Sequence, residues 1–144
     1  MAVDARIAGL IPHAGAMCLL ERIEHWDESS VTLATSTHRD PANPLADRSG
    51  LRSIHLCEYG AQAMAAHGGL VAQAGGRRAS PGLLVSLRDV ELHRDFVHDL
   101  DGELHVEARR IQASESAWQY SFRVLHAGTL LAQGRAVVSA ASGA

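Results

Sequence analysis

Lysine is missing from this chain of 144 residues, because all 13 residues counted as lysine plus arginine are arginine. Its absence excludes the lysine of a P-loop and a lysine Schiff base with pyridoxal phosphate or a carbonyl substrate. The formal net charge of −3, with both signs spread along the chain, argues against nucleic acid as the main partner. The length and a hydrophobic content of 47% fit a single domain over residues 1–144.

Cysteine is scarce as well, since Cys18 and Cys57 are the only two and they form no Cys-x-x-Cys pair. Two small thiols among apolar neighbours are typical of a protein from a reducing compartment. The sequence contains no His-Glu-x-x-His spacing and no Gly-x-Ser-x-Gly elbow, so we expect no metal site, no cofactor and no serine hydrolase. The longest apolar segment, 54–74, is interrupted by polar residues. We therefore expect a cytoplasmic protein without membrane insertion.

The hydrophobic pattern predicts a short helix over 3–10 and strands over 19–26, 30–37, 83–93, 103–111, 118–125 and 129–140. One long helix is expected to start at Ser53 as its N-cap and to end at Gly68-Gly69 or Gly75-Gly76. A change of phase near Arg88 predicts a bulge in the third strand. Because the long helix is apolar nearly all the way round, it must be covered on most sides. The pattern therefore predicts an α+β fold, with a mostly antiparallel curved sheet around one central helix.

The polar side chains of this helix gather on one face. At 100° per residue, His55, Glu58 and Gln62 fall within roughly 60° of one another. A carboxylate in an otherwise apolar helix is costly to bury unless it is paired, and it is suited to holding or delivering a proton. A simple ion pair between Glu58 and Arg48 or Arg52 is the competing interpretation, and the spacing leaves both open.

Several segments resemble one enzyme family. The segment Cys57-Glu58-Tyr59-Gly60-Ala61-Gln62-Ala63 resembles the helix of hotdog-fold 3-hydroxyacyl carrier-protein dehydratases. In that helix a catalytic Glu is followed four residues later by Gln. The family's N-terminal Pro-His motif resembles Pro12-His13 within residues 11–20, and residues 128–136 run in register with its closing strands. Together with Asn43-Pro44-Leu45, these segments look most like the ApeP-type subgroup, which is associated with aryl polyene biosynthesis.

The resemblance implies a hotdog fold and elimination of water from a 3-hydroxyacyl thioester, giving a trans-2-enoyl thioester in fatty-acid or polyene-type biosynthesis. The substrate is implied to be carried on phosphopantetheine, as an acyl carrier protein thioester or an acyl-CoA. The implied assembly is a dimer, either a homodimer or a heterodimer with another hotdog protein.

The site residues follow from the resemblance and from the helix start. Glu58 is expected to protonate the departing hydroxyl, with Gln62 orienting it. The backbone amides of Ser53 and Ile54 are expected to stabilise negative charge on the thioester carbonyl, because a helix start carries unpaired N–H groups and a positive dipole end. Two further residues complete the expected substrate-binding set: Asn43, at the mouth of the site, and His13, whose motif is implied to bond backbone groups.

One departure from the family concerns the base. Pro44 stands fourteen residues before Glu58, where the resembled family has the His of a Gly-His-Phe-Pro-Gly loop. His55, one turn before Glu58, is therefore the candidate base, and His38 and His13 are alternatives. Two other functions stay open. One is a hotdog acyl thioesterase, in which the same carboxylate activates water or attacks the thioester. The other is a non-catalytic subunit that completes a His-bearing hotdog dehydratase.

Overall fold

The computed structural model of the chain describes residues 4–11, 15–77 and 82–140. These residues contain the expected long helix and all the expected strands, with ends that differ by a few residues. The elements in chain order are α1 (Ala5–Leu10), η1 (Gly15–Met17), β1 (Arg22–Trp26), β2 (Ser30–Thr35), η2 (Thr37–Arg39), η3 (Ser53–His55), α2 (Leu56–Ala74), β3 (Gly82–Leu92), β4 (Leu104–Ala113), β5 (Ala117–His126) and β6 (Thr129–Ala140), where η marks a single 3-10 turn.

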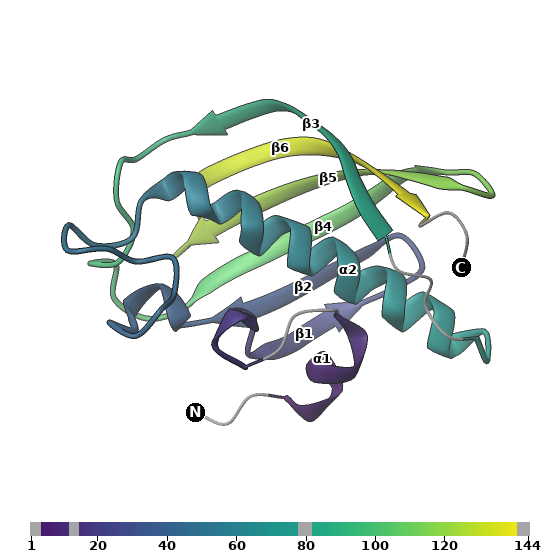
Figure 1. Cartoon of the computed structure of the whole chain (residues 1–144), viewed down its shortest axis with the longest axis horizontal. Helices are drawn as coiled ribbons and strands as arrows, with labels where there is room; N and C mark the ends of the chain where they lie inside the picture. Colours follow the sequence, from purple (N-terminus) through teal and green to yellow (C-terminus); the bar gives the residue numbers. More distant parts are fainter. Residues whose placement is uncertain (1–3, 12–14, 78–81, 141–144) are drawn as a thin grey trace.

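The strands form one antiparallel sheet in the order β1-β2-β4-β5-β6-β3. The sheet curves around α2, which runs along its concave face, and α1 lies beside β1 (Figure 1). Successive strand residues point to opposite faces, so Phe122 and Val124 are buried under the helix while Arg123 between them is exposed. The predicted α+β architecture, a curved antiparallel sheet around one helix, is confirmed.

Glycine allows the helix to lie close to the sheet. A Cβ built on Gly60 of α2 is 2.5 Å from Cδ2 of Phe122 on β5, and one on Gly134 of β6 is 2.8 Å from Cε1 of the same ring. Phe122 therefore fills the space between helix and sheet, and any side chain at either glycine requires its ring to move.

The long helix begins later than expected. Ser53 is not its N-cap, because Ser53–His55 form the 3-10 turn η3 and His55 caps α2. The N–H of Ser53 donates instead to the carbonyl oxygen of Asp95 at 2.9 Å, which draws this segment out of the helix. At the other end the helix runs through Gly68-Gly69 and stops at Gly75-Gly76, where Gly76 has a φ of 70° that favours glycine.

Strand β1 begins at Arg22 and not at Leu19, because side chains already bind the polar backbone groups of Leu19. Its N–H donates to Oε1 of Gln62 at 2.9 Å. Its carbonyl oxygen accepts from the hydroxyls of Thr35 at 2.6 Å and Thr37 at 2.7 Å. This segment therefore connects the helix and the end of β2 instead of extending the sheet.

Strand β3 contains the predicted bulge. Its register with β6 shifts between Arg88 and Glu91, and Asp89 within this interval has a φ of 55°. A second shift, which the sequence did not predict, lies between Leu84 and Ser86. Strand β3 forms one edge of the sheet and β1 forms the other.

The expected N-terminal helix forms as α1, in which the side chain of Asp4 caps the N–H of Arg6 at 3.0 Å. Residues 12–14, with the Pro12-His13 motif, lie outside the described residues. Across the described ranges, no helix has the length and apolar character needed to span a membrane.

Candidate active site

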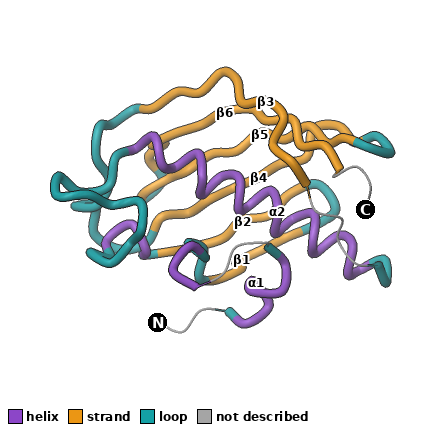
Figure 2. The backbone as a smooth tube through the Cα atoms, viewed as in Figure 1, coloured by secondary structure: helices purple, strands orange, loops and turns teal. Residues whose placement is uncertain are grey.

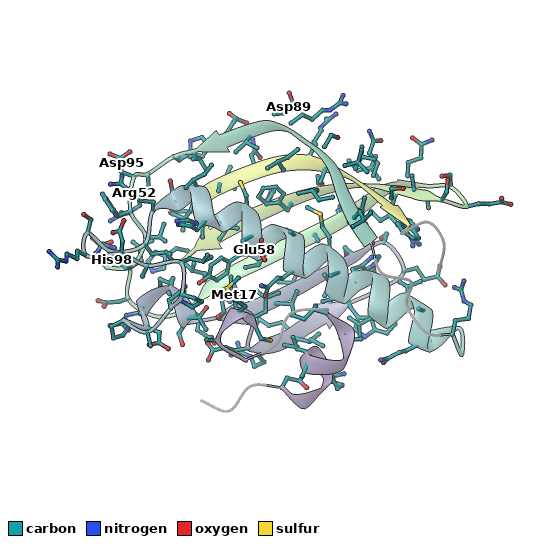
Figure 3. The ribbon with its side chains drawn as sticks, viewed as in Figure 1. Met17, Arg52, Glu58, Asp89, Asp95 and His98 are labelled. Carbon is teal, nitrogen blue, oxygen red and sulfur yellow. The ribbon has the colours of Figure 1, made fainter. Side chains whose placement is uncertain are left out.

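The carboxyl group predicted to act in catalysis lies in the first turn of α2. Glu58 is half-buried, whereas Gln62 one turn later is fully buried. Nε2 of Gln62 donates a hydrogen bond to Oε1 of Glu58 at 3.3 Å. Figure 3 shows Glu58 in front of the sheet and close to Met17. The structure therefore brings Glu58 and Gln62 together on the stripe predicted from their spacing.

Gln62 attaches this pair to the segment that leads into β1. Its Oε1 accepts from the N–H of Leu19 at 2.9 Å, and its Nε2 donates to the carbonyl oxygen of Met17 at 2.6 Å. A backbone N–H needs an acceptor and a carbonyl needs a donor, so these two contacts determine which end of the amide faces Glu58. Both hydrogens of Nε2 are used, one on Met17 and one on Glu58. A carboxamide held in this way is well suited to orienting a carboxyl group.

The Tyr59 hydroxyl lies in a second buried polar cluster, which the sequence did not predict. This hydroxyl lies 2.9 Å from Oγ1 of Thr37 and accepts from Nδ2 of Asn43 at 3.0 Å. Burial raises the pKa of Tyr59, so its hydroxyl keeps its proton. The signal was available, because a tyrosine inside an apolar helix needs a partner for its hydroxyl.

Asn43 belongs to this cluster, whereas the sequence placed it at the mouth of the site. It is buried, its Nδ2 also donates to the carbonyl oxygen of Thr37 at 2.9 Å, and its Oδ1 accepts from the N–H of Leu45 at 2.9 Å. All its side-chain hydrogen-bonding groups are thus engaged within the chain. Asn43 holds the long loop between β2 and α2 (Figure 2) in place.

The start of the helix is attached to the segment after β3. Because the N–H of Ser53 is bound to Asp95, it is not available to polarise a substrate carbonyl, contrary to our expectation. Ile54 is exposed, at 49% of its full accessible surface, and the role of its amide stays a prediction. The guanidinium of Arg52 lies 4.8 Å from the centroid of the Phe96 ring, in a cation–π contact. Arg52 and Asp95 both lie at the end of the molecule where α2 begins (Figure 3).

The three candidate bases have different surroundings. His55 is half-buried and is the last residue before α2, one turn ahead of Glu58. His38 is fully enclosed, its Nε2 donates to the carbonyl oxygen of Leu100 at 2.9 Å, and burial lowers its pKa. His13 lies outside the described residues. Of these histidines, His55 is the one next to the helix turn that carries Glu58.

The two thiols are poor nucleophiles. Burial raises the pKa of Cys18 and of Cys57, which lowers the fraction of thiolate at neutral pH. Within residues 4–11, 15–77 and 82–140, no group of three or more His, Cys, Asp or Glu side chains is arranged to hold a metal ion. Glu58 therefore stands out as the acid–base candidate of α2.

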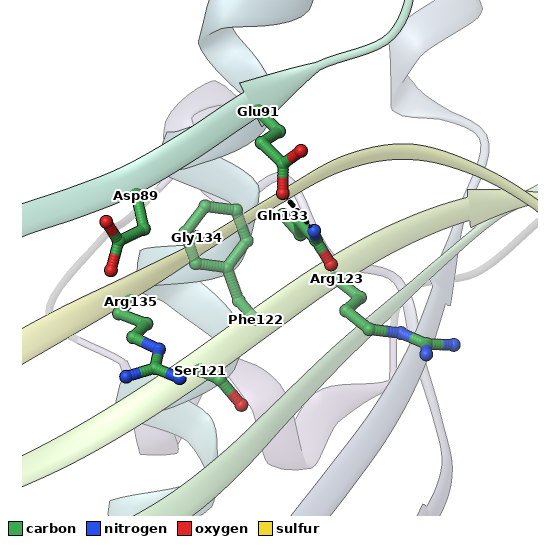
Figure 4. A pocket seen from close by; sticks show the side chains of 8 residues that line it. All are labelled: Asp89, Glu91, Ser121, Phe122, Arg123, Gln133, Gly134 and Arg135. Atoms are coloured by element: carbon green, nitrogen blue, oxygen red, sulfur yellow. Dashed lines mark hydrogen bonds between the residues drawn. The ribbon is translucent and has the colours of Figure 1, made fainter.

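A cavity of about 370 Å³ lies on the other face of the sheet from α2 (Figure 4). Glu91 accepts a hydrogen bond from Gln133 at its rim. Charges of both signs alternate around it; its lining residues are Asp89, Glu91, Ser121, Phe122, Arg123, Gln133, Gly134 and Arg135. This cavity is separated from Glu58 by the sheet, so we do not assign it to the candidate site.

The geometry around Glu58 fits proton transfer. The carboxyl group is partly accessible, it receives an N–H from a fully buried amide, and it lies at the positive end of a helix of 19 residues. Such a group can deliver a proton to a leaving hydroxyl or remove one from a water molecule.

The model of the ApeP-like family, described as ApeP dehydratase, matches residues 5–142. The sequence has no match among curated proteins.

Several solved structures share the fold. The dehydratase heterocomplex ApeI:P from Xenorhabdus doucetiae is similar with a TM-score of 0.84 and 21% identity, over 95% of this chain and 91% of that chain. A mutant of the phenylacetic acid degradation protein PaaI from Thermus thermophilus has a TM-score of 0.59 and 18% identity, over 83% and 92%. A hypothetical thioesterase with coenzyme A from Streptococcus pneumoniae has a TM-score of 0.60 and 14% identity, over 83% and 84%. At these identities the likeness establishes the hotdog fold and not the reaction.

Proposed function

Since the chain belongs to the ApeP-like dehydratase family, we propose that it eliminates water from a 3-hydroxyacyl thioester to give a trans-2-enoyl thioester. The acyl chain is carried on phosphopantetheine, as a thioester of an acyl carrier protein or of coenzyme A. The pathway proposed for this cytoplasmic reaction is fatty-acid or aryl polyene biosynthesis.

The proposed reaction balances through one base and one acid. The base, His55, takes the proton alpha to the thioester carbonyl, and the electron pair of that C–H bond forms the new C=C bond as the beta C–O bond breaks. Glu58 gives its proton to the departing hydroxyl, which leaves as water. The amide of Ile54 polarises the thioester carbonyl while negative charge develops on it. In this mechanism Gln62 orients Glu58, and the binding role of His13 stays a prediction.

One observation supports this proposal above the others. Glu58 is the carboxyl group of α2, and a fully buried glutamine anchored at two backbone positions donates a hydrogen bond to it. A purely structural acid on a surface needs no such support, because water satisfies it. A group that must meet a substrate in one orientation does need it.

The proposal is tested by incubating the full chain with a 3-hydroxyacyl carrier-protein thioester and following the product by mass spectrometry. Loss of one water from the acyl thioester supports the dehydratase. Glu58→Gln is expected to abolish turnover, whereas Glu28→Gln, on the exposed turn after β1, is the matched control and leaves it unchanged. Unchanged turnover in Glu58→Gln would remove this carboxyl from the mechanism.

The same assay separates the alternatives. Release of free acid supports the hotdog thioesterase, since the carboxyl then activates water or attacks the thioester. An inactive chain that restores or raises the activity of a His-bearing hotdog protein supports the non-catalytic subunit. That outcome agrees with the absence of the family's loop His at Pro44.

We also propose that the partner of this chain is a second hotdog protein, bound along β3. Five of the seven large hydrophobic side chains exposed in the described residues lie on this strand: Leu83, Leu84, Val85, Leu87 and Leu92. An edge strand with free backbone groups and exposed leucines aggregates unless another strand covers it. The relative in the ApeI:P structure is part of a heterocomplex, which supports a partner of the same fold.

The two forms of the dimer are distinguished by the mass of the chain in solution. If a second copy of this chain pairs along β3, the assembly is a two-fold homodimer. Light scattering of the chain alone is expected to give twice the monomer mass in that case. A monomer that gains mass only with a second hotdog protein identifies a heterodimer, and a monomer under both conditions contradicts the proposal.

A further inference from the structure

We infer that Thr37 and Tyr59 are positioning residues for Glu58, acting through Leu19 and Gln62. This inference rests on the proposed function, because it explains how the carboxyl of that reaction is held. It adds residues on a different part of the chain, since Thr37 lies in the turn after β2.

The hydrogen bonds around Tyr59 lead toward Leu19. Asn43 donates to the Tyr59 oxygen, so the Tyr59 hydrogen goes to its other neighbour, Oγ1 of Thr37, at 2.9 Å. Oγ1 of Thr37 lies 2.7 Å from the carbonyl oxygen of Leu19 and 2.9 Å from Oγ1 of Thr35, which also donates to that carbonyl, at 2.6 Å. Tyr59 thereby holds Thr37, and Thr37 and Thr35 together hold Leu19.

Leu19 passes this constraint to the helix. Its carbonyl oxygen is held by Thr37 and Thr35, and its N–H donates to Oε1 of Gln62 at 2.9 Å. Gln62 in turn donates to Oε1 of Glu58. Since Glu58 and Tyr59 are neighbours on α2, these contacts form a closed ring that starts and ends on the same helix turn. Tyr59 and Gln62 are fully buried, so the ring is shielded from competing water.

The test uses variants that remove or keep one hydroxyl in the full-length chain. Thr37→Val removes Oγ1, and Thr37→Ser keeps it. Thr32→Val makes the same change on β2 at a half-buried position outside the ring and serves as the matched control. We expect Thr37→Val to lower kcat roughly ten- to hundredfold with KM unchanged, because a small displacement of the acid impairs the reaction more than binding. Thr37→Ser is expected to recover most of kcat, and Thr32→Val to retain all of it.

A second readout does not depend on activity. Hydrogen exchange of the Leu19 amide and of the Gln62 side-chain amide, followed by NMR, is expected to accelerate in Thr37→Val and Tyr59→Phe but not in Thr32→Val. If the wild type does not dehydrate the thioester, the proposed function fails, while faster exchange still supports the ring. Unchanged exchange in Thr37→Val, or equal kcat in Thr37→Val and the wild type, overturns the inference.

Discussion

The two edge strands of the sheet differ in length and in how exposed their side chains are. Strand β1 has five residues, and the backbone just before it is covered by the N-terminal segment, since the N–H of Asp4 donates to the carbonyl oxygen of Glu21 at 2.7 Å. It also carries the charged side chains Arg22 and Glu24. Strand β3 has eleven residues, and Leu83 and Val85 are exposed at 58% and 62%. The chain itself contacts the β1 edge, whereas β3 exposes large hydrophobic side chains, and it is there that we propose a partner.

The same contrast extends to the helix. Side-chain hydrogen bonds connect α2 to the segments on either side of β1. Gln62 accepts from the N–H of Leu19, and His67 donates to the carbonyl oxygen of Asp27 at 3.0 Å. The helix positions Glu58 through the first of these contacts, because Gln62 bonds both Leu19 and Glu58. The candidate site therefore lies on the side of the helix that contacts the segment before β1, whereas the proposed partner binds along β3, at the opposite edge of the sheet.

The largest expected effect is the loss of association with a partner when β3 is altered. Val85→Lys places an unpaired charge in the proposed apolar interface, and we expect association to weaken more than about a hundredfold, because burying an unpaired charge costs several kcal/mol. Sedimentation at several protein concentrations measures this. His25→Lys, at a 70% exposed side chain of β1, is the matched control and leaves association unchanged. A Val85→Lys variant with the wild-type mass would show that β3 is not the interface.

A smaller effect is expected in the interior between the two edges. Gly60→Ala pushes a methyl group against Phe122 and is expected to lower the free energy of unfolding by about 1–3 kcal/mol. Gly68→Ala is its control on the same helix, because a Cβ there meets nothing within 4 Å, and it is expected to stabilise by up to about 1 kcal/mol. Urea unfolding measures both. A loss of association in Gly68→Ala would indicate that the partner also covers this part of the helix.

The folded chain is expected to lose stability in acid. His67 is buried, with its Nδ1 accepting from the hydroxyl of Tyr120 at 2.8 Å, and burial lowers its pKa. Burial also lowers the pKa of His38 and raises the pKa of Tyr120 to about 12. The unfolded chain binds protons on both histidines more readily than the folded chain. The contribution of these two histidines to the free energy of unfolding is therefore complete above the unfolded pKa of histidine, about 6.5, and falls as the pH drops below it.

The size of this pH effect is bounded. Each histidine contributes at most about 1.4 kcal/mol per pH unit to the slope of the unfolding free energy. Chemical unfolding between pH 7 and pH 5 measures the slope. His67→Gln is expected to reduce it, and His25→Gln, an exposed histidine on β1, is the control that does not. An equal slope in His67→Gln and the wild type would contradict a neutral buried His67.

The smallest expected effect concerns the charged β1 edge. Nη2 of Arg22 donates to Oε1 of Glu103 at 3.0 Å, and the Arg22 side chain is 38% exposed. Arg22→Gln is expected to cost about 1 kcal/mol or less and to leave association unchanged, because solvent screens this pair. Thermal unfolding at low and high salt is the measurement. A change in association would show that β1 is also an interface.

Much of the fold was predictable because it follows from local periodicity. The alternation of residues 103–111 and 118–125 identified β4 and β5, and the phase change near Arg88 identified the bulge of β3. The boundaries that were wrong have nonlocal causes. Strand β1 starts late because Gln62 binds Leu19, and α2 starts late because Asp95 binds Ser53. Contacts of that kind join residues about forty positions apart, which no local pattern records.

The candidate site likewise has one part that the sequence predicted and one part that only the folded chain reveals. The sequence alone determined that Glu58 and Gln62 share one face of an apolar helix, because helical geometry places residues four apart on the same side. The tertiary structure alone decided that Asn43 supports a loop, that Tyr59 and Thr37 join the ring around Glu58, and that β3 is left exposed. Spacing along a helix is a property of neighbouring residues, whereas burial and hydrogen-bond partners depend on which distant segments the folded sheet brings against them.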